Sequence, residues 1–172
     1  SLLEGTFMEN VPLIPVSAVT GEGLDQLRYE FAKLAKKFVN TEIEKPFRLY
    51  VDRSFTLKGF GTVVTGTVLT GSLSQDQAVF QYPQVRSIRI RGMQSHGINV
   101  KEVKAGQRVA LNLTGVGKEE VLRGNQLAKQ ESLISSYIFN ASLSLLKNAP
   151  TPLKNRPRVR LHLGTQELIG RI

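Results

Sequence analysis

The sequence contains no cysteine and only two histidines, His96 and His162, which lie far apart along the chain. Without cysteine there is no disulfide framework and no zinc site built from thiolates. Two distant histidines also argue against a metal site. No apolar run is long enough to span a membrane and the start shows no signal-peptide pattern, so we expect a cytoplasmic protein without membrane contact.

Acidic residues are scarce compared with basic ones, at 14 Asp and Glu against 23 Lys and Arg, which gives a net charge of +9. Residues 1–40 carry −1, residues 41–131 carry +5 and residues 132–172 carry +5. Clustered cationic charge favours a polyanionic partner, nucleic acid first, because neutralised phosphates release counterions. A basic solvated surface without a partner is the alternative interpretation.

The glycines of Gly61-Thr-Val-Val-Thr-Gly66 have the spacing of a phosphate-binding P-loop. The P-loop pattern requires a Lys and then a Ser or Thr after its last glycine, but Thr67 and Val68 follow here. The next residues are β-branched and rich in turn formers, so they do not predict the helix N-terminus that would attract an anion. We interpret these glycines as features of a β-hairpin.

The first 40 residues predict a strand followed by a helix. The segment 11–19, VPLIPVSAV, is typical of a short buried strand, and a turn at Gly21 follows it. Apolar residues then recur at helical spacing, namely Leu24, Leu27, Phe31, Leu34 and Phe38. One strand and one helix cannot enclose a core, so residues 1–40 are expected to end a larger α/β domain, and the polar residues 41–46 to form a linker.

Residues 47–131 change to a period of two. Six β-rich runs are separated by turn residues, namely FRLYV, TVVTGTVLTG, QAVFQY, SIRIRGM, QRVALNL and GNQLA. This pattern predicts a compact antiparallel β-barrel. In the fourth run, Ile88 and Ile90 are expected to face the core, with Arg89 and Arg91 facing outward.

Residues 132–172 predict a second β region. Apolar and polar side chains alternate from Tyr137 to Leu145, and again from Arg158 to Leu163. About 40 residues supply too few strands to close a barrel, so we expect the first part of a second, incomplete β-barrel.

Three segments resemble the translational GTPases of the elongation factor Tu superfamily. VPLIPVSAVTGEGLDQL is similar to the last guanine-recognition segment of their G domains. FRLYVDRSFTLKGFGTVVTGTVLTG is similar to the opening of their second domain, and AGQRVALNLTGVGKEEVLRGNQLA to its closing strands. The pair Asp52-Arg53, the segment 106–112 (GQRVALN) and the segment 160–165 (RLHLGT) resemble the selenocysteine-specific elongation factor family, also called SelB.

The resemblance implies a mainly β fold. Its parts are the terminal strand and helix of a G domain (1–40), a linker (41–46), the translation-factor β-barrel called domain II (47–131) and the first part of domain III (132–172). It also implies that domain II holds the aminoacyl end of a charged tRNA. Asp52, Arg53, Phe55, Thr65 and Arg108 match the positions of that pocket.

The two arginines stand where elongation factor Tu has an acid and an amide, so the implied pocket favours an anion. A selenol is largely ionised at neutral pH, whereas the serine hydroxyl is neutral, and this difference would separate selenocysteine from serine. The resemblance further places Gln94 and His96 near the terminal adenosine of the tRNA. It makes Ser17 and Ala18 the remnant of a guanine-binding turn.

The implied partners are selenocysteinyl-tRNA, the ribosome and a selenocysteine-insertion element of messenger RNA. GTP and Mg²⁺ are the implied cofactors of the parent GTPase. The P-loop, the switch residues and the Asn-Lys-x-Asp motif are not in this sequence, and neither is the winged-helix region that contacts the messenger RNA element in bacteria. We therefore expect no nucleotide hydrolysis by these residues alone.

Plainer interpretations of the same residues remain open. Asp52 and Arg53 would also suit a surface ion pair, Arg108 an exposed strand position, and Phe55 a core aromatic. The tRNA-binding domain of another translational GTPase is one alternative function. A barrel that binds only proteins is another.

Overall fold

The computed structural model describes residues 3–37, 41–75, 77–146, 149 and 152–172. The chain divides into two compact units. One consists of residues 1–39 with 140–154, and the other of residues 40–139 with 155–172. Among the described residues, no helix is long and apolar enough to cross a membrane.

The first unit contains the helix α1 (Leu24–Lys37), which confirms the helical spacing as far as Lys37. Phe38, the last apolar residue of that spacing, lies outside the described residues. The strand expected at 11–19 does not form: the segment pairs with no other described strand, and its Leu13 is 72% exposed. An extended apolar segment becomes a strand only where a neighbouring strand accepts its backbone hydrogen bonds.

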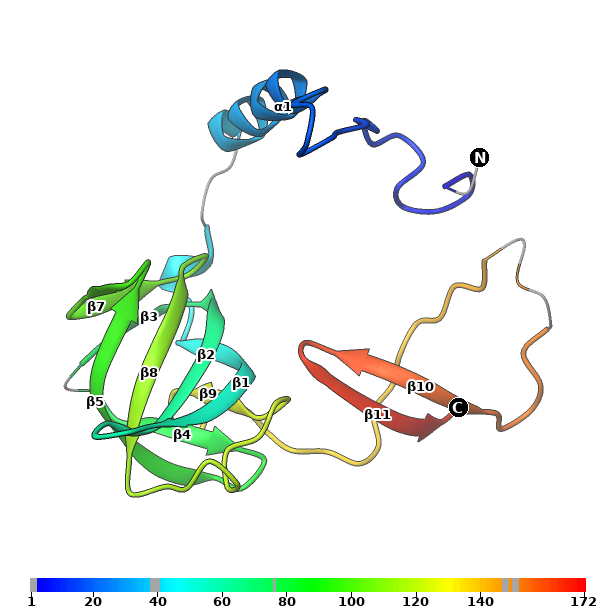
Figure 1. Cartoon of the computed structure of the whole chain (residues 1–172). Helices are drawn as coiled ribbons and strands as arrows, with labels where there is room; N and C mark the ends of the chain where they lie inside the picture. The colour runs from blue at the N-terminus through cyan, green and yellow to red at the C-terminus, as the bar shows by residue number, and fades with distance from the viewer. Residues whose placement is uncertain (1–2, 38–40, 76, 147–148, 150–151) are drawn as a thin grey trace. The chain divides into compact units, whose positions relative to one another are not determined.

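The second unit is dominated by β-structure (Figure 1). A short 3₁₀ helix, η1 (Thr41–Glu44), leads into it. The strands of its barrel are β1 (Arg48–Leu57), β2 (Gly61–Thr70), β4 (Val79–Tyr82), β5 (Arg86–Ser95), β8 (Arg108–Thr114) and β9 (Gln126–Ala128). All six runs expected between residues 47 and 131 therefore form strands.

The six strands close into an antiparallel ring. Their order is β4-β9-β1-β2-β8-β5, and an additional pairing of β4 with β5 completes the circle. β6 (Ile98–Asn99) extends β5 at a hairpin, while β3 (Ser72–Ser74) and β7 (Glu102–Lys104) pair as a small separate sheet. These three strands are too short to produce a period in the sequence. Closure leaves no long edge of the barrel unpaired.

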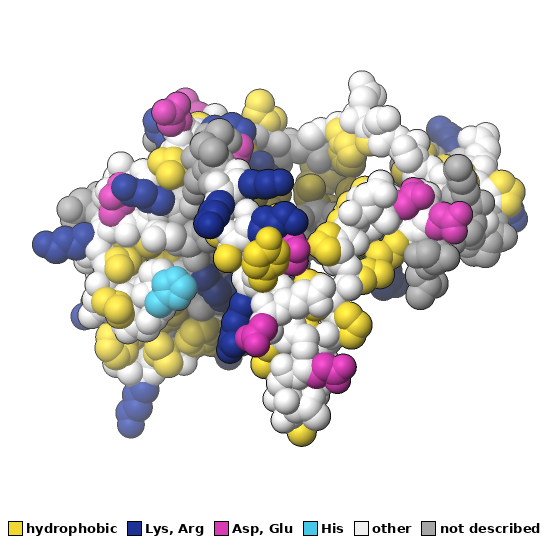
Figure 2. Space-filling model, turned by 90° about the horizontal axis from the view of Figure 1, so that it is seen from above, with side chains coloured by type: hydrophobic (Ala, Val, Ile, Leu, Met, Phe, Trp, Pro, Cys, Tyr) yellow, Lys and Arg dark blue, Asp and Glu magenta, His cyan; other side chains and the backbone are white. Residues whose placement is uncertain are grey.

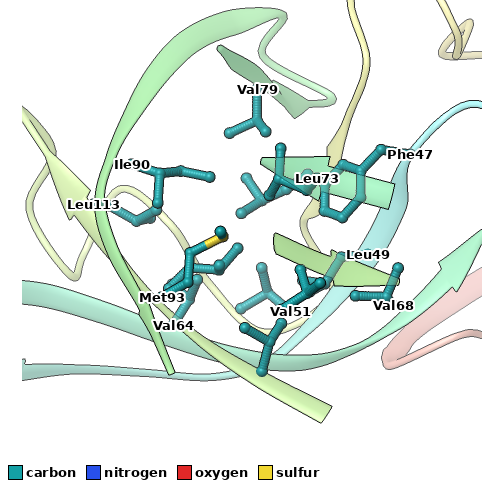
Figure 3. Packing of buried hydrophobic residues seen from close by; sticks show 14 of the residues in the cluster. Phe47, Leu49, Val51, Val64, Val68, Leu73, Val79, Ile90, Met93 and Leu113 are labelled. Carbon is teal, nitrogen blue, oxygen red and sulfur yellow. The ribbon is translucent and has the colours of Figure 1, made fainter. Parts of the chain in front are cut away.

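Alternate residues of the barrel strands fill its interior. Ile88 and Ile90 are 1% and 7% exposed, as expected, whereas Arg89 and Arg91 are exposed. Figure 3 shows the inward side chains from different strands pointing toward one another, with Met93 among the aliphatic residues. This core holds the strands in a single register, and it therefore sets the positions of the outward side chains.

The near-P-loop is the β1–β2 hairpin and the start of β2. Gly59 and Gly61 have φ values of 84° and 83°, in the left-handed region that glycine adopts without strain. Gly66 lies in the middle of β2, opposite Val51. The glycines therefore shape a turn and a close strand contact.

Residues 132–172 form two strands, but alternation predicted only the first of them. β10 (Arg158–Leu163) and β11 (Gln166–Arg171) make an antiparallel hairpin, which confirms the alternation over 158–163. The strand expected from Tyr137 to Leu145 does not form, and Tyr137 is fully exposed. This segment alternates correctly, but none of the described strands lies beside it to pair with it.

Candidate functional site

A β-bulge in β1 presents Asp52. Val51 pairs with Gly66 of β2 and Arg53 pairs with Thr65, so Asp52 is the extra residue without an opposite partner. Such bulges redirect a side chain and increase the local twist. The bulge turns Asp52 toward the outer surface of β2 and β8, where its carboxylate meets two side chains.

Asp52, Thr65 and Arg108 form a compact cluster on three adjacent strands. Arg108 donates to the carboxylate of Asp52 through both terminal nitrogens, Nη1 to Oδ2 at 2.6 Å and Nη2 to Oδ1 at 3.2 Å. The hydroxyl of Thr65 donates to Oδ1 of Asp52 at 2.6 Å. Three of the five residues predicted for the aminoacyl pocket are therefore brought together.

The contacts within the cluster shift the pKa of Asp52 and the pKa of Arg108. Burial raises the pKa of Asp52, but the hydrogen bonds from Arg108 and Thr65 and the charges of Arg108 and Arg53 outweigh it, so the pKa lies below its ordinary value. The hydrogen bond to Asp52 and the charge of its carboxylate raise the pKa of Arg108. Both groups are ionised at neutral pH, and each neutralises much of the other's charge.

Replacing Asp52 with asparagine is expected to change how the free energy of unfolding depends on pH. A carboxyl whose pKa is lowered by folding stabilises the folded state above the unfolded pKa of about 3.9, and this contribution disappears as pH falls through the folded pKa. Because the Arg108 side chain is 54% exposed, we expect a contribution of only about 1 kcal/mol. Urea unfolding of the wild type and Asp52→Asn should therefore differ by about 1 kcal/mol more at neutral pH than at about pH 2.5.

Glu102→Gln, which removes the carboxylate of a more exposed ion pair with Lys104, is the control for this comparison. A difference between wild type and Asp52→Asn that stays constant with pH would contradict the stabilising role of the ion pair.

Arg53 and Phe55 line a pocket to which Thr65 and Arg108 do not contribute. Asp52 and Ser54 also line this open pocket of ≈ 510 Å³ against the loop before β9. The loop residues of the pocket are Lys118, Glu119, Leu122 and Arg123. Arg53 makes no ion pair with any described acidic residue, so its charge is available to a ligand.

Sequence reasoning missed the loop side of this pocket. Its only signal was the charged residues of VGKEEVLRGN, two basic and two acidic, which do not reveal that the loop folds back onto β1. In the structure two side-chain hydrogen bonds hold the loop against the barrel. Thr62 Oγ1 donates to the carbonyl of Val116 at 2.6 Å, and Ser54 Oγ donates to the carbonyl of Lys118 at 3.3 Å.

A buried polar network supports the same loop from below. Gln81, which is fully buried, donates to the carbonyl of Glu120 at 2.6 Å and to Oδ1 of Asn125 at 2.9 Å, and accepts from Arg86 at 2.9 Å. Arg86 also pairs with the Glu120 carboxylate, which accepts from the amide of Gly117 at 2.6 Å. The Gly117 amide and Arg86 lower the pKa of Glu120. Arg86 is therefore engaged by Gln81 and Glu120.

The predicted tRNA-end residues lie on the same sheet as the cluster. Thr65 is opposite Arg53 on one side and Ala110 on the other, and Ala110 is opposite Gln94 of β5. Residues directly opposite in a sheet share a face. Arg53, Thr65 and Gln94 therefore belong to one row on the outer face of the barrel.

The β5–β6 turn continues from the end of this row. His96 is exposed in this turn, where its φ is 52°. Gln94 donates to Oδ1 of Asn99 at 2.9 Å, and Ser95 donates to the carbonyl of Arg108 at 2.9 Å. These contacts hold the turn beside β8, so Gln94 and His96 reach one end of the surface that carries Arg108.

Known proteins resemble this chain over nearly its whole length. Residues 61–128 match the family described as "Elongation factor Tu domain 2". The selenocysteine-specific elongation factor of Desulfomicrobium baculatum is 39% identical over 99% of the chain, and that of Escherichia coli is 30% identical over 93%. The chain belongs to the selenocysteine-specific elongation factor family.

The solved structures of selenocysteine-specific elongation factors have the same fold. A bacterial one superposes with a TM-score of 0.80 at 33% identity over 99% of the chain. One from Methanococcus maripaludis, described as a complex with the GTP analogue GPPNHP, gives 0.76 at 26% identity over 98%. The chain spans only about a quarter of its relatives, 27% of the Desulfomicrobium baculatum factor and 25% of the Escherichia coli one.

Two further residues that the selenocysteine-specific elongation factor resemblance singles out, Ser17 and Ala18, belong to the other compact unit of the chain. There the Ser17 amide donates to the carbonyl of Glu22 at 3.0 Å and Ser17 Oγ accepts from the Thr20 amide at 3.2 Å. These hydrogen bonds close a turn over residues 17–22. His162 lies opposite Glu167 on the β10–β11 hairpin and is exposed.

The arginines of the β5 and β10 strands differ in whether an acidic residue pairs with them. Arg160 pairs with Glu167 at 3.1 Å. Arg89, Arg91 and Arg158 are exposed and form no ion pair with a described acidic residue. Figure 2 shows Lys and Arg side chains at many points of the face in view, with fewer Asp and Glu side chains. Among the described residues, no group of three or more His, Cys, Asp or Glu could hold a metal ion.

Proposed function

We propose that this chain is the aminoacyl-tRNA-binding middle part of a selenocysteine-specific elongation factor, which delivers selenocysteinyl-tRNA to the ribosome in a GTP-dependent manner. The observation that carries the proposal is the bulged Asp52 with a guanidinium on each side, Arg108 across β2 and Arg53 next in the chain. Family membership over nearly the whole chain supports it.

The geometry suits a ligand that carries both an anion and an amine. Arg53 offers a positive charge at the pocket wall and forms no ion pair with a described acidic residue. Asp52 can accept a hydrogen bond from the α-amino group of an aminoacyl ester. That bond would weaken the hold of Asp52 on Arg108, whose exposed guanidinium could then turn toward the selenolate. Serine, whose side chain is neutral, would not gain these charged interactions.

The remaining assignments extend this site. Gln94 and His96 would contact the terminal adenosine of the tRNA, and Phe55 would form an apolar wall beside the aminoacyl group. Ser17 and Ala18 would contact guanine in the complete factor, where GTP and Mg²⁺ are held by segments outside this sequence. We propose the boundaries 1–40, 41–46, 47–131 and 132–172 for the end of the G domain, the linker, domain II and the first part of domain III. The same proposal includes binding of a selenocysteine-insertion element of messenger RNA by the complete factor. It also includes a cytoplasmic location for that factor.

Exposed arginines would supply affinity without sequence preference. Arg89, Arg91 and Arg158 can contact tRNA phosphates, because charged contacts to phosphates are independent of base identity. Binding of tRNA should then weaken as salt concentration rises. A salt slope near zero would favour a barrel that binds only proteins.

Replacing Arg108 with glutamine in the complete factor is expected to reduce its preference for selenocysteinyl-tRNA over seryl-tRNA by about tenfold, because one charged hydrogen bond contributes about 1.5 kcal/mol. Arg53→Gln should have a similar effect. Equilibrium binding of the two tRNAs to each variant measures the preference.

Arg89→Gln is the matched control, since it removes the same charge from an exposed strand position outside the cluster. Arg89→Gln should weaken the binding of both tRNAs equally. If the preference survives unchanged in both Arg108→Gln and Arg53→Gln, the pocket assignment is wrong.

A further inference from the structure

The tip of the β10–β11 hairpin contacts the barrel at the bulge of β1. Leu163 and Gln166 are the last paired residues, so Gly164 and Thr165 form a two-residue turn. Gly164 has a φ of 60° in the first position, where a type II′ turn requires a positive value. The turn therefore projects the Thr165 side chain from a rigid hairpin end.

Thr165 binds the peptide group that precedes Asp52. Its hydroxyl donates to the carbonyl oxygen of Val51 at 2.7 Å, and the same oxygen accepts from the amide of Gly124 at 3.0 Å. This carbonyl and the amide nitrogen of Asp52 belong to one planar peptide unit. Holding the oxygen from two directions therefore fixes the orientation of the backbone at the bulge, and with it the direction of the Asp52 side chain.

Two glycines keep the tip close to the barrel. A Cβ on Gly164 would lie 2.5 Å from the ring of Tyr50, and a Cβ on Gly124 would lie 2.8 Å from the side chain of Gln166. Arg123, which lines the candidate pocket, donates from Nε to the carbonyl of Thr165 at 3.1 Å. The tip thus contacts both walls of the pocket, β1 on one side and the loop before β9 on the other.

We propose that Thr165 is a positioning residue of the candidate site: its hydroxyl sets the β1 bulge so that Asp52 meets Arg108 and Thr65, and it links the β10–β11 hairpin to ligand binding. The effect on tRNA rests on the function proposed above, but the positioning of Asp52 does not. Movement of the hairpin would change the pocket through this hydrogen bond, in addition to the contact of Arg123 with the Thr165 carbonyl.

Thr165→Val tests the proposal, because valine keeps the shape and removes the hydroxyl while Val51 retains the Gly124 amide. The ¹³Cγ shift of Asp52 and the guanidinium resonances of Arg108, measured by NMR on the 172-residue chain, are expected to move. Thr165→Ser should restore them. Thr114→Val is the matched control, since Thr114 is exposed at the end of β8 and its hydroxyl has no partner among the described residues.

In the complete factor, Thr165→Val is expected to lower the preference for selenocysteinyl-tRNA about threefold, the effect of weakening one hydrogen bond. Unmoved Asp52 and Arg108 resonances would overturn the positioning role. Moved resonances with an unchanged tRNA preference would support positioning and count against the proposed function. If Thr165→Val does not fold, Thr165→Ala removes the same hydroxyl and is judged by the same resonances.

Discussion

Gly66→Ala is expected to lower the free energy of unfolding by about 3 kcal/mol, the largest effect of any change considered for this chain. A Cβ at Gly66 would lie 2.3 Å from the carbonyl oxygen of Tyr50 and 2.8 Å from Cδ2 of Leu49. Neither neighbour can move away easily, because the carbonyl is backbone of the paired strand and Leu49 is fully buried. Strands β1 and β2 would have to separate beside the bulge.

Gly92→Ala provides the comparison. Gly92 also lies in a barrel strand, but a Cβ there would meet nothing within 4 Å. The free energy of unfolding of this variant should lie within about 0.5 kcal/mol of the wild-type value, as is usual for surface substitutions. Urea unfolding followed by circular dichroism measures both. Equal stability of Gly66→Ala and Gly92→Ala would show that β1 and β2 pack less closely than the structure indicates.

Gln81→Met is expected to destabilise the chain by about 2–3 kcal/mol. Methionine has a similar length but cannot form the hydrogen bonds that the buried Gln81 makes with Glu120, Asn125 and Arg86. The carbonyl of Glu120 and one nitrogen of Arg86 would each lose a partner in a partly buried setting. Unsatisfied buried polar groups cost more than the hydrogen bond itself contributes.

The loop before β9 should respond to the same change. Hydrogen exchange at the amides of Gly117 and Leu122 is expected to accelerate in Gln81→Met, because the network beneath the loop holds both ends of it. Gln84→Met, at an exposed turn position in the same region, is the control and should change neither stability nor exchange. Unaltered loop exchange in Gln81→Met would mean that the contacts of Thr62 and Ser54 hold the loop alone.

The barrel was predictable because its strands alternate strongly and are bounded by turn residues. Ile88 and Ile90 face the core for the same reason that they stand two apart in the sequence. The helix after Gly21 was equally clear, since its apolar residues follow a period of 3.6. These features are local, so a short window of sequence contains the information.

Alternation of apolar and polar residues predicted strands wrongly where no described strand lies alongside to pair. The segments 11–19 and 137–145 carry the expected apolar residues, yet neither forms a strand. A strand is defined by hydrogen bonds to another segment, and no sequence window shows whether that segment lies alongside. The short strands β3, β6 and β7 were not predicted, because they are too short to show alternation and only their pairing defines them.

The sequence by itself determined the barrel, the helix and, through family resemblance, the residue types of the candidate site. It could not show that Asp52 and Arg108, 56 positions apart, form an ion pair before any ligand arrives. Nor could it show that Arg123 and Thr165 contact the same region. Those relations depend on the bulge in β1, the register of β2 with β8 and the fold of the loop before β9. Only the closed sheet decides them, because it brings distant segments into contact and fixes which side chains share a face.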